Sequence, residues 1–196
     1  LAVGARVTFA ERFAPDLFWQ LVIEHNCTVF AGVPTMYVAL LTAPAGLTQG
    51  QAILRQGISG GSALAHEVKQ DFADRFGCQI VEAYGTTEAI ISHMLPFCES
   101  RRSGCIGTVL EDPLYKADIV DESGRSFPPN EIGELVVRSP SVMQGYYADP
   151  EGTAQAIKNG WFHTGDEGFR DEDGYFYLVG RKQDMIKRGG ERIIPQ

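Results

Sequence analysis

The sequence predicts a mixed α/β protein in which a parallel strand–helix layer is followed by a small β-barrel or β-sheet. Up to about residue 100, short apolar runs of strand length alternate with segments of helix length. This alternation is typical of a parallel α/β layer. Beyond that point, connections rich in glycine and proline separate the apolar runs, which favours β structure. Because 44% of the 196 residues are hydrophobic, the chain can bury a substantial core.

The first half carries signals for alternating strands and helices. Pro15 suits a first helical turn, and an apolar stripe continues from there to about His25. Another helix is expected from Ala65, whose apolar face repeats at helical spacing until Gly77 stops it. The remaining elements expected here are strands over 5–10, 27–33, 55–61 and 79–84 and a helix over 34–41.

The second half is expected to be rich in β structure. Residues 116–139 predict two strands around a connection of glycine and proline, and a short helix is expected near 150–157. Residues 168–180 predict a hairpin that turns at Asp173 and Gly174. The acidic turn lacks the twelve-residue pattern of a calcium loop. We expect three regions: an α/β subdomain over 1–103, a β-rich subdomain over 104–180, and a hinge over 181–196.

Composition argues against several classes of protein. The net charge of −8 argues against a nucleic-acid binder, although 181–196 holds five basic and two acidic residues. That basic stretch is interpreted either as a solvated face or as a surface that meets phosphates. The four cysteines form no C-x-x-C pair, which favours free thiols in a reducing cytoplasm over a zinc site. No apolar run reaches the length of a membrane span, and the start "LAVGARVTFA" resembles a chain entered in mid-domain.

Two glycine-containing stretches of the first half are candidates for ligand binding. In "ISGGSAL" (58–64), Gly60 and Gly61 would let a flat ligand approach the backbone closely. Ser62 is a candidate there too, but taken alone it is better interpreted as the cap of the following helix.

The stretch "EAYGTTEAI" (82–90) combines several groups that bind nucleotides. It offers an aromatic face, clearance for a ligand, two hydroxyls and a carboxylate, from Tyr84, Gly85, Thr86, Thr87 and Glu88. Aromatic rings stack on bases, hydroxyls contact phosphates, and a carboxylate can help to hold Mg²⁺. An equally good interpretation is a strand followed by a Thr-capped helix, with Glu88 at its N-terminus.

Two stretches of the second half add charged candidates. In "GWFHTGDEGF" (160–169), Asp166 follows a glycine and would accept two hydrogen bonds from a vicinal diol such as that of ribose, although alone it is better interpreted as a turn cap. In "GRKQDMIKRGGERIIP" (180–195), Arg181 would fork onto phosphate or ribose, and a glycine pair permits bending.

Together and in this order, these stretches resemble the adenylate-forming superfamily of acyl-CoA synthetases, luciferase-like enzymes and the adenylation domains of peptide synthetases. "VFAGVPTMYVALL" and "GELVVRSPSVMQGYY" also match its running pattern, and the resemblance covers almost the whole chain. It looks closest to fatty-acyl or other carboxylate–CoA ligases. Such an enzyme uses ATP and Mg²⁺ to join a small-molecule carboxylate to AMP, releases pyrophosphate, and then transfers the acyl group to coenzyme A.

The resemblance also implies residue roles. It assigns the adenine contacts to Gly60, Gly61, Ser62 and the stacking ring of Tyr84, which Gly85 follows. It assigns the phosphate contacts to Thr86 and Thr87, Mg²⁺ binding to Glu88, and binding of the ribose hydroxyls to Asp166. Arg181 would contact ribose or phosphate near the hinge, and Lys187 would act in the thioester-forming state. Thr87, Glu88 and Lys187 are the residues expected to take part in the chemistry.

The sequence departs from the family pattern in three respects. The phosphate-binding loop rich in Ser, Thr and Gly and the C-terminal domain with its adenylation lysine do not occur in it, so we expect an inactive fragment of a longer enzyme. Gln183 stands where Asp or Lys is usual. One alternative is an amino-acid adenylation domain that loads a carrier-protein thiol, although the apolar "AIISHMLPF" leans towards acyl substrates. The other is a non-catalytic nucleotide-binding module; the sequence does not fix the oligomeric state.

Overall fold

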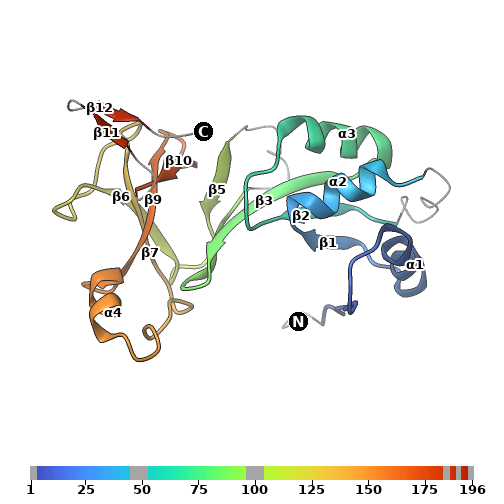
Figure 1. Ribbon diagram of the computed structural model, residues 1–196, viewed down its shortest axis with the longest axis horizontal. Coiled ribbons are helices and arrows are strands. Elements are labelled where there is room, and N and C mark those ends of the chain that lie inside the picture. Colours follow the sequence, from blue (N-terminus) through green and yellow to red (C-terminus); the bar gives the residue numbers. More distant parts are fainter. Residues whose placement is uncertain (1–3, 45–52, 96–103, 183–185, 189–190, 194–196) are drawn as a thin grey trace. The chain divides into compact units, whose positions relative to one another are not determined.

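The computed structural model describes residues 4–44, 53–95, 104–182, 186–188 and 191–193. Its internal contacts divide the chain into two compact units, Leu1–Glu82 and Ala83–Gln196. The boundary at residue 103 that we expect from the sequence lies inside the second unit. The two units are described separately below, and Figure 1 shows the elements of each.

The first unit is the parallel strand–helix layer that the sequence predicts. Strand β2 pairs in parallel with β1 on one side and with the first half of β3 on the other, with Ser59 opposite both Gly32 and Glu82. Its elements are α1 (Pro15–His25), β1 (Val29–Gly32), α2 (Pro34–Thr42), β2 (Gln56–Ser59), α3 (His66–Phe76) and the start of β3 (Gln79–Thr86).

Helix boundaries in this unit follow the local signals. Helix α1 begins at Pro15, and its C-cap residue Asn26 is left-handed at a φ of 52°. Helix α3 ends at Gly77, which has a φ of 66° and donates to the carbonyl of Ala73. Glycine is favoured there because a Cβ disfavours left-handed backbone. Pro15 and Gly77 are thus the boundary residues that the sequence already singles out, whereas Asn26 is not among them.

The expected strand over 5–10 is wrong. The described residues 4–10 belong to no strand, and the side chains of Val7 and Phe9 are 50% and 88% exposed. The Arg6 guanidinium donates to the carbonyl of His25 instead. An apolar run becomes a strand only where another strand completes its hydrogen bonds, so sequence alone overestimates it here.

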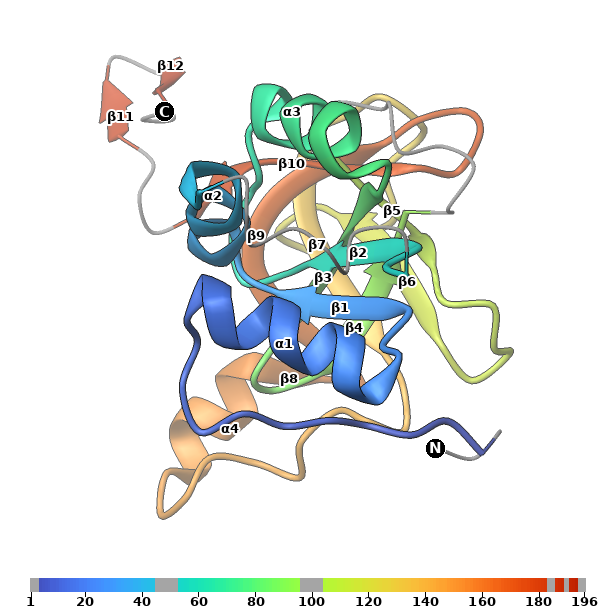
Figure 2. The same cartoon turned by 90° about the vertical axis from the view of Figure 1, so that its right-hand side faces the viewer.

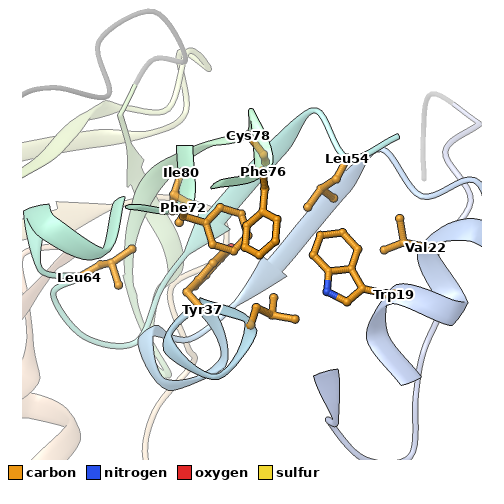
Figure 3. Packing of buried hydrophobic residues seen from close by; sticks show 10 residues of the cluster. Trp19, Val22, Tyr37, Leu54, Leu64, Phe72, Phe76, Cys78 and Ile80 are labelled. Atoms are coloured by element: carbon orange, nitrogen blue, oxygen red, sulfur yellow. The ribbon is translucent and has the colours of Figure 1, made fainter. Parts of the chain in front are cut away.

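Aromatic side chains from all three helices form the core of the first unit. Figure 3 shows Tyr37, Phe72 and Phe76 packed beside one another, and their ring centroids lie 5.2 Å and 4.7 Å apart in that order. Trp19 reaches Phe76 at 5.1 Å. The Tyr37 hydroxyl donates to the carbonyl of Ile58 at 2.7 Å, which ties α2 to β2. This core holds the glycine-containing end of β2 in place.

The second unit is an antiparallel sheet. Its strands follow the order β3-β4-β5-β10-β9-β7-β6, with β8 paired to β9 and a separate β11–β12 pair. The order of these described strands is open, so a sheet forms rather than the barrel. Its elements are β4 (Ile90–Met94), β5 (Cys105–Val109), β6 (Lys116–Val120), β7 (Gly133–Arg138), α4 (Pro150–Ala156), β8 (Ile157–Lys158), β9 (Trp161–Arg170), β10 (Phe176–Arg181), β11 (Ile186–Arg188) and β12 (Glu191–Ile193).

Strand β9 is the long, curved strand that Figure 2 shows, and it pairs with both β7 and β10. Its register shifts against each neighbour, between Glu134 and Val136 on β7 and between Leu178 and Gly180 on β10. The β9–β10 hairpin turns at Gly174, as predicted. Extra residues in a ladder bend a strand and redirect side chains. The candidate site lies beside these irregularities.

The helix considered as an alternative after Tyr84 does not form. Strand β3 continues to Thr86, turns through residues 87–89, and returns as β4, with Thr86 opposite Ile90. Ser62 does not cap α3 either, because the N-cap position is Ala65 and no side chain caps it. Both structural explanations of these motifs are therefore wrong.

None of the described helices is both long and apolar enough to cross a lipid bilayer.

Candidate functional site

The centre of the candidate site is the Asp166 carboxylate on β9. The Tyr84 hydroxyl on β3 donates to its Oδ2 at 2.6 Å, and Arg181 Nε on β10 lies 3.2 Å from its Oδ1. Asp166 is only 5% exposed, whereas the side chain of Arg181 is 72% exposed. Residues from distant parts of the sequence thus meet at one buried carboxylate.

The backbone around Thr164 and Gly165 directs Asp166 towards these partners. Gly165 has a φ of +73°, a conformation that L side chains rarely adopt, and open space surrounds the position of a Cβ. The Thr164 hydroxyl donates to the carbonyl of Leu135 at 2.8 Å and accepts from the amide of Asp166 at 3.1 Å. Asp166 itself lies within β9 and bonds two side chains, so its interpretation as a turn cap is wrong.

Tyr84 is held from two sides. Its ring meets the edge of His93, the residue opposite it on β4, with centroids 5.7 Å apart. Burial first, and then the hydrogen bond to Asp166, raises the pKa of Tyr84 well above its ordinary value, so the phenol remains a donor. Burial also lowers the pKa of His93 to about 3, so the ring is neutral, and its Nδ1 lies 2.9 Å from the Ser92 hydroxyl.

Sequence reasoning missed a second carboxylate, Glu134 on β7. Its Oε1 accepts from the amide of Gly165 at 3.3 Å, and its Oε2 lies 3.3 Å from Lys182 Nζ and 3.2 Å from His163 Nδ1. Burial alone would raise the pKa of Glu134, but His163 and Lys182 hold it below its ordinary value. A carboxylate within the apolar run "GELVV" is the sequence signal that could have identified it.

Glu88 lies in the turn between β3 and β4, and residues 141–146 hold it there. The Tyr146 hydroxyl donates to its Oε1 at 2.9 Å, and the amide of Met143 donates to its carbonyl at 2.6 Å. The Ser141 hydroxyl donates to the carbonyl of Ala89 at 2.9 Å. In the part of the chain that the structure describes, no group of three or more His, Cys, Asp or Glu could hold a metal ion.

The residues beside Glu88 differ in whether the β3–β4 turn itself needs them. The Thr86 hydroxyl accepts from the amide of Ala89 at 3.2 Å, whereas Thr87 is exposed. A Cβ on Gly85 would overlap the carbonyl of Ile90, so the β3–β4 hairpin itself requires that glycine. Clearance for a ligand is therefore not needed to explain Gly85.

The remaining predicted residues lie elsewhere in the chain. Gly60, Gly61 and Ser62 follow β2 in the first unit, where Gly61 has a φ of +88° and both Gly61 and Ser62 are exposed. The amide of Gly60 donates to the carbonyl of Gly32 at 3.1 Å, which joins the carboxyl ends of two parallel strands. Lys187 lies in β11, opposite Arg192 in β12. Gln183, at the expected hinge position, lies outside the described residues.

A family comparison identifies the class of protein in which this arrangement occurs. The family model described as "AMP-binding enzyme" matches residues 1–147, most of the 196-residue chain. The chain therefore belongs to the AMP-binding enzyme family.

Two curated relatives of the chain are CoA ligases. The chain is 37% identical over 198 aligned residues to a crotonobetaine/carnitine–CoA ligase from Salmonella typhimurium, with 98% of this chain and 38% of that protein covered. It is 36% identical to a long-chain-fatty-acid–CoA ligase from Bacillus subtilis, with 100% of this chain and 35% of that protein covered. The chain thus spans little more than a third of the length of these relatives.

Solved structures agree. ATP-bound MatB from Rhodopseudomonas palustris matches with a TM-score of 0.84 and 33% identity, over 95% of this chain and 37% of that one. O-succinylbenzoate coenzyme A synthetase (MenE) from Bacillus subtilis, in complex with ATP and magnesium ion, matches with a TM-score of 0.84 and 27% identity, over 95% of this chain and 38% of that one. The mixed α/β fold predicted from the sequence is therefore confirmed.

Proposed function

We propose that this chain provides the adenosine-binding part of an ATP-dependent carboxylate–CoA ligase. In the first half-reaction, a carboxylate oxygen would attack the α-phosphorus of ATP, forming an acyl-adenylate and releasing pyrophosphate. In the second, the sulfur of CoA would attack the acyl carbon, forming a thioester and releasing AMP. The observation that carries the proposal is the convergence of Tyr84 and Arg181 on the buried Asp166 carboxylate.

Asp166 is proposed to bind the two ribose hydroxyls. A carboxylate accepts such hydrogen bonds well, and each bond to a charged group contributes roughly 1.5–3 kcal/mol. Arg181 is the partner that can yield, because its own side chain is 72% exposed and water can solvate its guanidinium when a ligand takes its place. Its guanidinium would then remain near the ribose or the phosphate. Tyr84, anchored through its hydroxyl, would present its ring to adenine.

The turn between β3 and β4 is proposed to face the phosphates. Thr87 is exposed, whereas the Thr86 hydroxyl oxygen accepts from the Ala89 amide, so the Thr87 hydroxyl is the less constrained of the two. Glu88 would contribute one carboxylate oxygen to Mg²⁺, with phosphate and water as the other ligands. When bound, Mg²⁺ would neutralise phosphate charge. Alignment and charge neutralisation, rather than a protein nucleophile, suit the residue types found here.

The other assignments depend on the family resemblance. Gly60, Gly61 and Ser62 would lie along adenine, supported by the exposed, glycine-containing end of β2. Lys187 would act in the thioester-forming state. We propose a fatty-acid type of carboxylate, since a long-chain-fatty-acid–CoA ligase is among the relatives and the residues after Glu88 are mostly apolar. Cys27 and Cys78 are free thiols, which supports a reducing, cytoplasmic location.

The test of the ribose assignment is Asp166→Asn, with Asp112→Asn as the matched control. Asp112 is exposed, and its Oδ1 accepts from the amide of Leu114, a bond that an asparagine keeps. In the full-length protein we expect Asp166→Asn to raise the KM for ATP at least about 10-fold, because charged hydrogen bonds to the diol are lost. The control should leave that KM unchanged. If the two variants behave alike, Asp166 does not bind the ribose.

A further inference from the structure

Glu134 connects the two backbone segments that carry the groups meeting at Asp166. Its Oε1 accepts from the amide of Gly165, the residue before Asp166, at 3.3 Å. Its Oε2 lies 3.3 Å from Nζ of Lys182, the residue after Arg181. One side chain on β7 therefore contacts the chain immediately before the carboxylate and immediately after the guanidinium.

A backbone contact completes the connection. The amide of Lys182 donates to the carbonyl of Gly165 at 2.8 Å, so the same two residues are joined directly as well as through Glu134. In the described ladder between β9 and β10, Arg181 lies opposite Asp166 at the end of a stretch where the register has shifted. Where the register of two paired strands shifts, the hydrogen bonds between the strands are locally disrupted. A contact from a third strand therefore helps to fix the last residue pair beside the shift.

Burial makes the Glu134 contacts stronger than those of a surface ion pair. The Glu134 side chain is 13% exposed and that of His163 is 15% exposed, whereas Lys182 is 44% exposed. Charges that are partly withdrawn from water interact more strongly, and the carboxylate accepts from the Gly165 amide and the Lys182 ammonium. Gly165 gains no support from a side chain of its own, and a Cβ there would meet open space.

We propose that Glu134 is a positioning residue for ribose recognition: it fixes the backbone at Gly165 and Lys182, so that the Asp166 carboxylate is presented to the ribose hydroxyls. The inference rests on the proposed function, since it gives Glu134 a role only through Asp166. Supporting residues of this kind matter because binding groups need to be held within a fraction of an ångström of their working geometry.

The experiment compares two ligands and two glutamates. Dissociation constants for AMP and for 2′,3′-dideoxy-AMP are measured by calorimetry on the full-length protein and on its Glu134→Gln and Glu131→Gln variants. Glu131 precedes the same strand and is exposed, so its variant controls for the loss of a charge nearby. Glutamine at 134 keeps an acceptor for Gly165 but loses the charge that attracts Lys182.

We expect Glu134→Gln to weaken AMP binding about 3- to 10-fold while dideoxy-AMP binding changes less than about 2-fold. The ratio of the dissociation constants for dideoxy-AMP and AMP, which measures the preference for the ribose hydroxyls, would then decrease. A general loss of stability does not change that ratio. Equal weakening of both ligands, or a Glu134→Gln variant that matches Glu131→Gln, would overturn the inference.

Lys182→Gln provides a second variant in case Glu134→Gln fails to fold, because the lysine side chain is 44% exposed and its loss leaves the carboxylate in place. It should reduce the same preference by a smaller factor, and an unchanged preference counts against Glu134 acting through Lys182. A wild-type protein that binds AMP and dideoxy-AMP equally contradicts the ribose role of Asp166 itself. That pattern separates failure of the proposed function from failure of this inference.

Discussion

The Asp166 carboxylate has two partners that differ in how easily a ligand could replace them. Tyr84 donates from a partly buried phenol at 2.6 Å, whereas Arg181 Nε approaches from a largely exposed side chain at 3.2 Å. Because short hydrogen bonds to charged groups are the stronger ones, the tyrosine contact is the permanent one and the arginine contact is exchangeable. One oxygen of Asp166 can therefore be offered to a ligand without unfolding its surroundings.

His93, behind Tyr84, makes stability depend on pH. Its pKa is lowered by burial from 6.5 to about 3, so the folded form needs a neutral imidazole. The stability that this provides is complete above about pH 6.5 and is lost as the pH falls from there towards 3. From pH 7 to pH 5 the single group should cost about 2 kcal/mol of unfolding free energy.

Urea unfolding of His93→Phe at these two pH values measures this contribution. The variant should lose about 2 kcal/mol less than the wild type over the interval, since phenylalanine cannot be protonated. His66→Phe, at the exposed first residue of α3, is the control and should retain the wild-type dependence. An identical pH dependence for His93→Phe and wild type would show that His93 is not the group responsible.

At the scale of elements, the segment 139–146 and the β3–β4 turn act together. Three hydrogen bonds join them: Met143 to the carbonyl of Glu88, Ser141 to the carbonyl of Ala89, and Tyr146 to the Glu88 carboxylate. The first two fix the backbone of the turn, and the third orients its side chain. A turn held in this way presents Glu88 from a defined position rather than from a free loop.

Tyr146→Phe tests the orienting bond, and Tyr147→Phe is its matched control. Tyr147 is the adjacent residue and is fully exposed, whereas Tyr146 is 41% exposed and donates to Glu88. On the proposed Mg²⁺ role, we expect Tyr146→Phe to reduce the gain in ATP affinity that Mg²⁺ provides by about 2- to 5-fold, the value of one partly exposed hydrogen bond. Calorimetry with ATP, with and without Mg²⁺, measures that gain. If both phenylalanine variants keep the full gain, Tyr146 does not orient a metal ligand.

Local signals predicted the helices well, and pairing decided the strands. Pro15 and Gly77 mark helix boundaries through their own backbone preferences, so sequence suffices for them. Residues 5–10 form no strand and the chain after Tyr84 forms a hairpin instead of a helix, because both outcomes depend on which distant segment supplies hydrogen bonds.

The candidate site shows the same division. Tyr84, Asp166 and Arg181 were predicted, and they meet in the structure. Glu134 and Tyr146 were missed, because their importance lies in partners more than 30 residues away in sequence, at Gly165 and Glu88. The pattern of motifs identified groups that can touch a ligand. It could not identify the groups that hold them.

At the scale of the whole molecule, the chain joins two compact units and matches little more than a third of each curated relative. The residues that meet at Asp166 all belong to the second unit, whereas Gly60, Gly61 and Ser62 belong to the first. Strand β3 contains residues of both, since Glu82 ends one unit and Ala83 begins the other.

The 196-residue chain alone is expected to bind AMP weakly and to release little pyrophosphate from ATP with any carboxylate. The ribose and adenine contacts proposed above are within it, whereas the phosphate loop and the adenylation lysine of the family pattern do not occur in its sequence. Calorimetry with AMP and a pyrophosphate-release assay across carboxylates of graded length test the two halves of the prediction. Robust turnover by this chain would contradict it.

The contact between Glu134 and Lys182 has a consequence for how the family diverges. An acid and a base that support each other are constrained as a pair, so losing one removes the reason to keep the other. Homologues in which a neutral residue replaces Glu134 should therefore also have lost the basic residue at the position of Lys182. Engineers who graft this region into another scaffold will need to transfer both positions together.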